Sequence, residues 1–593
     1  MTPHPFTSAS AAETAYWLLP MVLPLVAAFL HAVPACRGAM ARLSPWAALP
    51  GVVVALTAHA GDGVSMPGVF LGLHLGLTGI TRVFLLFTSV LWLVAGVYAV
   101  FHHRSDPRRH VFFLFYLLSM AGNIGLLLTR DAASFFAAFA LMSFAAYGLV
   151  VHSGTPKAHE AGRVYIILVV LGEILLFPAL AMAAGHADSL LLTDMAARLP
   201  DAPHRNIIMA LLLLGFGIKA GALPLHVWLP LAHPAAPVPA SAVLSGCMIK
   251  AGLLGWMSFL PLGLLAMPGW GVGLAAAGLA AAVFGLVAGL LQSEPKALLA
   301  YSSIGKMGWM TVAVGVGLAV PESWPSVSVA VCVYALHHAW TKGALFLGVG
   351  VSHLPRSRWG VVAFWVGLLL PVLAFAGVSG TGGAAAKAAL KDVLYYLPGS
   401  WASLMQQAMW WTGGLGALLL ARFVYLVKPG PVHEASDRSV VGCAAAWSVA
   451  ILMVVAVPFL APLVGLKVSL AKGFTAAGLW SSVWPLLLAC ALAVVLWRKA
   501  VLPSWRMPPG DMLFAYRRAW PPLVALAHMR LFHILTRKHG SAVALLRQRS
   551  WGAPLWALLW AGERGLRRWP VVSCMLLALL LIITGLCVWR PGP

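Results

Sequence analysis

Long apolar runs alternate with short polar segments along most of the chain. A helix that crosses the hydrocarbon core of a bilayer needs about 20 apolar residues, and about sixteen runs meet or approach that length. These runs lie at 15–35, 45–60, 79–102, 110–128, 132–152, 164–184, 206–222, 240–263, 269–291, 298–319, 325–352, 359–378, 405–427, 440–464, 480–497 and 570–590. The pattern predicts an all-α polytopic membrane protein with about sixteen transmembrane helices.

Helix-breaking residues interrupt the chain at two places within this pattern. Prolines recur from Leu223-Pro224 to Pro239, and the stretch 377–383 reads GVSGTGG. Proline removes a backbone donor, and glycine weakens a helix. Interrupted helices at membrane depth, in two separate parts of a chain, indicate an ion site in transporters. The alternative is a proline-rich surface loop together with one kinked span.

The composition supports a membrane protein and excludes several other classes. Of the 593 residues, 61% are hydrophobic and 9% are charged, whereas an ordinary soluble domain carries about 25% charged residues. Collagen-like, disordered, coiled-coil and disulfide-stapled classes are excluded by the same numbers. The seven cysteines are scattered without C-x-x-C spacing, and the sequence shows no nucleotide loop, metal-ligand spacing or nucleophile constellation. We therefore expect no cofactor, no metal and no catalytic residue within the chain itself.

The basic residues predict how the chain lies in the bilayer. Lys and Arg together number 39 against 16 Asp and Glu, a formal net charge of +23. They are concentrated in the loops after odd-numbered runs, for example Arg104, Arg108 and Arg109, and are sparser after even-numbered runs. The positive-inside rule then places the odd loops in the cytoplasm and both termini outside it. Membrane orientation explains this charge better than binding to nucleic acid.

The segment 500–569 differs from the rest of the chain because basic and apolar residues are mixed throughout it. This mixture is typical of helix lying on a membrane surface, here the cytoplasmic one. Pro521, Pro522, Gly540 and Pro554 would divide such a helix into pieces. The alternative is an irregular basic tail attracted to anionic headgroups.

Ionisable residues within the apolar runs are functional candidates, because a charge near the bilayer centre is costly. The candidates are Glu173, Lys219, Lys250, Lys306, His337, His338, Lys342, Lys387 and Lys391. A desolvated lysine in a helix bundle can bind and release a proton, and a nearby carboxylate can control that exchange. The alternative for each is a residue near a helix end that extends to the interface, which applies most to Lys306 and Lys391. His226 and His233 flank the proline-rich break. They either hold the shape of the break or relay protons.

Several motifs resemble the antiporter-like subunits of respiratory complex I, Mrp-type cation/proton antiporters and group 4 hydrogenases. The most specific is LPLHVWLPLAHPAAPVPASAVLSGCMIKAG at 223–252, and the resemblance continues at 296–308, 337–350 and 377–391. It covers roughly the third to the twelfth span in consistent order. The version HPAAPVPASA is similar to the hydrogenase-4/formate hydrogenlyase branch of this family.

The resemblance implies a fold and a division of the chain. It implies two inverted five-helix repeats, at 111–263 and 264–427, with broken seventh and twelfth helices. Three N-terminal helices at 1–110 would precede them, and two further helices at 428–499 would follow. The segment 500–569 would be a lateral helix bracing neighbouring subunits, before a final transmembrane helix at 570–593.

The resemblance also implies a function and a set of residues. Lys219 matches the lysine of the seventh helix, Lys250 the relay position of the eighth, His338 and Lys342 the central relay, and Lys387 the exit lysine. The chain would move protons or sodium ions in a bacterial inner membrane. Its partners would be other membrane subunits and a soluble redox or other peripheral arm, and it would count as an enzyme only as part of an oxidoreductase complex. No residue selects the ion.

Three positions depart from the family pattern. Ala140 stands where the family carries a glutamate, the family motif I-E-N-I-G reads IGKMG at 304–308, and a third-span aspartate is replaced by Thr78. Either Glu173 has taken over as the partner of Lys219, or the carboxylate switch is lost and the subunit pumps poorly. We favour the first reading, because a buried glutamate without a partner is costly. The other open functions are a Mrp-type antiporter subunit and a non-pumping membrane anchor for a soluble partner.

Overall fold

The computed structural model describes residues 10–354, 357–427, 438–466 and 476–498, with single positions between 507 and 513. The predicted surface segment 500–569 and the predicted final span 570–590 therefore lie almost wholly outside the described residues. The chain divides into two compact units, residues 1–65 with 73–510 and residues 66–72 with 511–593. Every helix named below belongs to the first unit.

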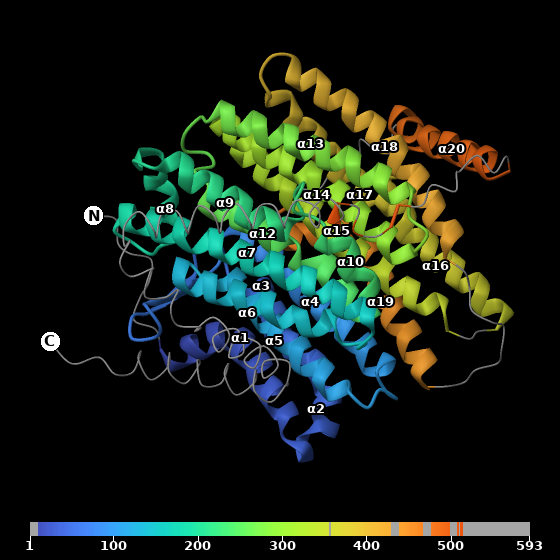
Figure 1. Cartoon of the computed structure of the whole chain (residues 1–593), viewed down its shortest axis with the longest axis horizontal. Coiled ribbons are helices and arrows are strands. Elements are labelled where there is room, and N and C mark those ends of the chain that lie inside the picture. The colour runs from blue at the N-terminus through green and yellow to red at the C-terminus, as the bar shows by residue number, and fades with distance from the viewer. Residues whose placement is uncertain are drawn as a thin grey trace, which may run out of the picture. The chain divides into compact units, whose positions relative to one another are not determined.

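The described chain is helical almost throughout, as Figure 1 shows. The helices are α1 (Ala11–Ala32), α2 (Arg37–Leu43), α3 (Leu49–Thr57), α4 (Gly79–His102), α5 (Arg109–Leu128), α6 (Ala132–Val150), α7 (Pro156–Ala187), α8 (Leu192–Arg198), α9 (Arg205–Ala220), α10 (Trp228–Ala235), α11 (Val238–Val243), α12 (Lys250–Phe259), α13 (Pro268–Leu290), α14 (Pro295–Ala319), α15 (Trp324–Ser352), α16 (Arg358–Ala376), α17 (Gly382–Val393), α18 (Ser400–Leu426), α19 (Arg438–Leu460) and α20 (Ala476–Arg498). Two short strands, β1 (Gly63–Met66) and β2 (Leu73–Gly76), form a two-stranded sheet before α4.

Eleven stretches of the described chain are long and apolar enough to cross a membrane. The protein is therefore an all-helical, multi-pass membrane protein, and the larger count of sixteen spans stays a prediction. Helix α9 is not one of these eleven stretches, because it has only 16 residues. Helices α14 and α15 are not among the eleven either, and they carry the buried lysines and histidines that the sequence singled out.

Both predicted helix breaks are confirmed. Helix α9 ends at Ala220, where Gly221 takes a left-handed conformation with φ +73°, and helix resumes at α10. Helix α16 ends at Ala376, where Gly377 has φ +81°, and helix resumes at α17. Glycine adopts this conformation without the steric cost that a side chain would add, so both breaks follow directly from the local sequence.

The predicted eighth span contains an irregularity that the sequence did not reveal. Its helix begins as α11 and ends as α12, but residues Leu244–Met248 between them form a π-helical turn. Single π turns inside α-helices occur frequently at functional sites. Here the turn comes immediately before Lys250.

Helix α15 lies at the centre of the described helices. From Ala330 to Ser352 all its residues are buried, and it packs against α4, α11, α14, α17 and α19. A helix apolar all round is expected to be surrounded on every side. The polar residues of α15 are therefore enclosed by other helices.

Candidate functional site

Lys219 lies in the last turn of α9, directly before the first break, and its ammonium group is buried. Its Nζ donates to Ser143 Oγ on α6 at 3.0 Å and to Tyr165 Oη on α7 at 3.3 Å. The ring centroids of Phe139, Tyr165 and Trp228 lie 5.6–5.9 Å from Nζ. Neutral oxygens and aromatic faces thus hold the cation, at a helix end whose dipole favours positive charge.

Glu173 lies on α7, two turns beyond Tyr165, and is half-buried. It interacts electrostatically with Lys219, but no direct ion pair between the two occurs in the described chain. Its Oε1 is buried and has no hydrogen-bond partner among the described residues. A buried acceptor of this kind needs a proton, a water or a moving partner. The role of Glu173 as partner of Lys219 stays a prediction.

The positions that depart from the family pattern have visible local roles. Ala140 lies one turn before Ser143 on α6. The resemblance implied a carboxylate at position 140, whereas the α6 group that contacts Lys219 in the structure is the Ser143 hydroxyl. Thr78 caps α4: its Oγ1 accepts from the Thr81 amide at 3.1 Å, and the Thr78 amide donates to Thr81 Oγ1 at 2.9 Å. Thr78 therefore serves the helix start.

Two buried lysines from different helices lie near three serines, Ser245 in the π turn and Ser302 and Ser303 on α14. Lys250 Nζ donates to the Ser245 carbonyl at 2.7 Å, and Ser245 Oγ lies 2.8 Å from Ser303 Oγ. Lys342 Nζ, on α15, donates to Ser302 Oγ. A serine hydroxyl can donate and accept at once. Lys250 and Lys342 interact electrostatically, and the hydroxyl pair of Ser245 and Ser303 lies beside them; a joint role of the two lysines stays a prediction.

The two histidines of α15 are buried beside these lysines. Neither ring nitrogen of His338 has a hydrogen-bond partner among the described residues, and the ring lies 5.9 Å from that of Phe375. His337 Nδ1 lies 3.3 Å from Thr341 Oγ1. Both histidines interact electrostatically with Lys250. A buried imidazole without partners has a free acceptor for a proton or a water.

Lys306 and Lys387 share a small cavity at the second break. The cavity has a volume of about 40 Å³, and both lysines line it, while one water needs about 10–15 Å³. Lys306 Nζ donates at 3.3 Å to the Phe375 carbonyl, one of the last carbonyls of α16 and therefore without a partner in its own helix. Lys391, one turn beyond Lys387, is exposed, so its placement agrees with a position at a surface.

His226 and His233 lie at the first break, as their sequence positions implied. His226 is buried, with its ring 5.1 Å from that of Phe284. His233 stacks on Phe346 at 4.7 Å, and its two ring nitrogens have no partner among the described residues. Its own carbonyl accepts from Ser241 Oγ at 3.0 Å. His233 therefore holds the shape of the break through its backbone and leaves its ring free for other contacts.

The predicted residues fall into two groups. Glu173 and Lys219 form the first, and the second runs from Lys250 and Lys342 through Lys306 to Lys387, each lysine interacting electrostatically with the next. Among the described residues no hydrogen bond joins Lys219 to Lys250. The sequence analysis did not single out the hydroxyl groups that contact these lysines, namely those of Ser143, Tyr165 and Ser302, nor the hydroxyl pair of Ser245 and Ser303. Ser245, Ser302 and Ser303 carried a signal, because they belong to the quoted motifs at 223–252 and 296–308.

The chain is similar to known proteins over its central part. Residues 129–360 match the family described as NADH:quinone oxidoreductase/Mrp antiporter, TM. Hydrogenase-4 component B of Escherichia coli (strain K12) is 30% identical over 295 residues, which are 48% of this chain and 44% of that protein. The chain spans about half the length of the curated relatives it matches.

Two solved structures show the same fold over nearly the whole chain. A chain of the Mrp complex from Dietzia sp. DQ12-45-1b superposes with a TM-score of 0.71 at 20% identity, covering 98% of this chain and 64% of that one. A chain of the membrane-bound sulfane sulfur reductase (MBS), an archaeal respiratory membrane complex, gives a TM-score of 0.64 at 20% identity, covering 96% and 100%. Both of these neighbours are parts of multisubunit membrane complexes.

Proposed function

We propose that this chain is an ion-translocating subunit of a multisubunit, membrane-bound redox complex, because residues 129–360 match the NADH:quinone oxidoreductase/Mrp antiporter family. It would move protons or sodium ions through its buried lysines and histidines and would have no redox centre of its own. Its partners would be other membrane subunits and a soluble redox arm. The similarity to hydrogenase-4 component B supports this choice of complex.

The observation that carries the proposal is a group of three lysines that interact electrostatically inside the helix bundle. Lys250 and Lys342 are buried and Lys306 is half-buried, and no carboxylate pairs with any of them in the described chain. Like charges repel strongly where water is excluded, so the three amines cannot all hold a proton. In this proposal a proton that enters such a group displaces another, and the hydroxyls of Ser245, Ser302 and Ser303 would take part in the path between Lys250 and Lys342.

The rest of the proposed route follows from the cavity at the second break. A proton leaving Lys342 would reach Lys306 and then Lys387, which share the 40 Å³ cavity, and Lys391 is exposed one turn further. Glu173 and Lys219 would form the matching group at the first break. In this proposal Glu173, Lys219 and Lys250 belong to the first of two inverted five-helix repeats, at 111–263, and Lys306, Lys342 and Lys387 to the second, at 264–427, with the odd-numbered loops in the cytoplasm of a bacterial cell.

A second candidate is a non-pumping membrane anchor for a soluble partner. The contacts of Lys219 favour it, because a serine and a tyrosine hold the ammonium group in place of a carboxylate. If Glu173 does not act on Lys219, this lysine has lost the charged group that would control its proton exchange. A Mrp-type antiporter subunit is the third candidate, and the fold shared with the Mrp complex supports it.

Purification with its native partners tests the proposal. A tagged chain would be isolated from its own membranes in mild detergent, and the co-purifying subunits would be identified by mass spectrometry. We expect hydrogenase or dehydrogenase subunits. Recovery of small antiporter subunits would favour the Mrp candidate, and recovery of a single soluble protein without redox centres would favour the anchor.

The role of the lysine group is then tested on the purified complex in proteoliposomes. We expect Lys342→Ala to abolish acidification, measured with a pH-sensitive dye, while electron transfer by the complex continues. Lys157→Ala is the matched control, because Lys157 is exposed in the first turn of α7. Full acidification by Lys342→Ala would contradict the proposed route.

A further inference from the structure

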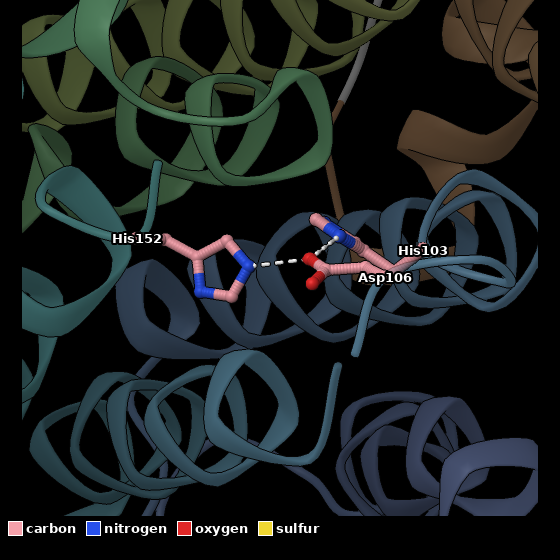
Figure 2. Close-up of side chains that lie close together, drawn as sticks. All are labelled: His103, Asp106 and His152. Carbon is pink, nitrogen blue, oxygen red and sulfur yellow. Dashed lines mark hydrogen bonds and ion pairs between the residues drawn. The ribbon is translucent and has the colours of Figure 1, made fainter. Parts of the chain in front are cut away.

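Two histidines and an aspartate from separate loops meet outside the lysine groups (Figure 2). His103 directly follows α4, Asp106 lies in the loop between α4 and α5, and His152 follows α6. Asp106 Oδ2 lies 3.0 Å from His103 Nδ1 and 2.7 Å from His152 Nε2. Both rings therefore point at one carboxylate oxygen, although His152 is distant from the other two residues in sequence.

The three side chains are held in place by their surroundings. The second carboxylate oxygen, Asp106 Oδ1, accepts from the Arg108 amide at 2.8 Å. The ring of Phe112 contacts both histidines, with centroids 4.1 Å from His103 and 5.3 Å from His152. The two histidine side chains are 5–6% exposed and that of Asp106 is 22% exposed. The group is preorganised and reaches solvent on the aspartate side.

Hydrogen bonding within the protein does not satisfy this group. His103 Nε2 is buried and has no hydrogen-bond partner among the described residues, so the only hydrogen bond of this ring is the one to Asp106. A network that served structure alone would normally satisfy both ring nitrogens. A neutral imidazole carries one nitrogen lone pair, so each of the two rings can serve as a ligand to a cation.

The aspartate supplies the negative charge. One of its oxygens lies within hydrogen-bond distance of both histidine rings and the other accepts from the Arg108 amide, and an aspartate side chain is an ordinary oxygen ligand of zinc. One anionic oxygen and two imidazoles make a ligand set suited to a borderline divalent metal ion.

We propose that His103, Asp106 and His152 form a binding site for Zn²⁺ with one open coordination position. Their three ligand atoms lie within 4.8 Å of one another. A zinc ion with bonds of about 2.0–2.2 Å to nitrogen and oxygen can occupy the centre of such a triangle in tetrahedral geometry, after small outward shifts of the side chains. Water on the exposed side of Asp106 would complete the shell. The ion would join the α4–α5 loop to the end of α6.

Cobalt substitution tests the site directly. The full-length chain, purified with whatever subunits accompany it, would be stripped with a chelator and titrated with Co²⁺. We expect the visible absorption of tetrahedral Co²⁺ at one equivalent and its loss when Zn²⁺ is added. Even changes in second-shell partners commonly weaken metal binding about 10–100-fold, so we expect His152→Gln and Asp106→Asn each to weaken Zn²⁺ binding about 100-fold.

A similar pair elsewhere in the chain is the matched control. His59 and Asp62 have the same i, i+3 spacing as His103 and Asp106 and lie 3.6 Å apart, but they are exposed, and no second histidine joins them among the described residues. His59→Gln should leave the Co²⁺ spectrum and the stoichiometry unchanged.

Thermal melting separates loss of the site from loss of the fold. Zn²⁺ should raise the melting temperature of the wild type and of His59→Gln, since a ligand stabilises the state that binds it, and should not raise that of His152→Gln. If His152→Gln does not fold, the same melting measurement is made on His103→Gln. Unchanged binding in a folded variant, or octahedral Co²⁺ in the wild type, would overturn the proposal.

Discussion

At the scale of single residues, the unusual feature is how many amines are buried with so few carboxylates. Lys219, Lys250 and Lys342 each donate to hydroxyl or carbonyl oxygens, and such neutral partners can hold either an ammonium group or an amine. A carboxylate would hold only the ammonium form tightly. Neutral partners therefore suit a lysine that must lose its proton, and Glu173 is the one carboxylate in reach of any of these three lysines among the described residues.

Glu173 provides the sharpest residue-scale prediction. We expect Glu173→Gln to abolish ion translocation by the assembled complex, because it removes the charge that interacts with Lys219. Acidification of proteoliposomes measures the effect, with electron transfer and subunit composition determined on the same sample. Glu160→Gln is the control, because Glu160 is exposed on the same helix.

The neutral contacts of Lys219 make a competing expectation. If Ser143 and Tyr165 alone determine its behaviour, Glu173→Gln pumps like the wild type and Tyr165→Phe does not. That result would show that Glu173 does not replace the missing glutamate. The proton exchange of Lys219 would then be controlled by its contacts with Ser143 on α6 and Tyr165 on α7.

At the scale of helices, close packing rests on small residues. Gly278 of α13 faces α14 so closely that a Cβ atom there would lie 2.6 Å from the Gly308 carbonyl oxygen and 2.8 Å from the Val312 amide. Lipid tails are as apolar as a leucine side chain, so helices in membranes associate through such close backbone contact. The α13–α14 pair therefore forms the platform for Ser302, Ser303 and Lys306.

This packing predicts a difference between two glycines of one helix. Gly278→Val would force α13 and α14 apart, and overpacking typically costs about 1–3 kcal/mol. Gly273→Val is the control, because no atom lies within 4 Å of a Cβ at that position. We expect a clearly lower melting temperature for Gly278→Val only, measured by fluorescence of the purified protein. Equal melting temperatures would show that α14 is held by other contacts.

The helices also show which parts of the fold a sequence can predict. Gly221 and Gly377 act through their own backbone, so both breaks were predictable from local sequence. The contact between Lys219, Ser143 and Tyr165 was not, because it needs three helices at once. The group of His103, Asp106 and His152 was not predictable for the same reason. His103 and Asp106 follow α4 and His152 follows α6, and only the folded chain brings them together.

At the scale of the whole molecule, the direction of the proposed ion path depends on which ends of the helices face the cytoplasm. Helix α7 has 32 residues and is therefore roughly 48 Å long at 1.5 Å per residue. This exceeds the hydrocarbon core of a bilayer, about 30 Å. The segments before and after α7 must therefore lie on opposite sides of the membrane, and one labelling experiment determines the orientation.

Cysteine labelling at the two ends of α7 tests the positive-inside prediction. Lys157, at the start of the helix, follows an odd-numbered run and should be cytoplasmic, whereas Ala197 in α8 follows an even-numbered run and should be outside; both positions are exposed. In a variant without native cysteines, Ala197→Cys should react with a membrane-impermeant maleimide in intact cells, and Lys157→Cys only after permeabilisation. The opposite pattern would invert the predicted topology, and with it the side of the membrane to which each end of the proposed ion path opens.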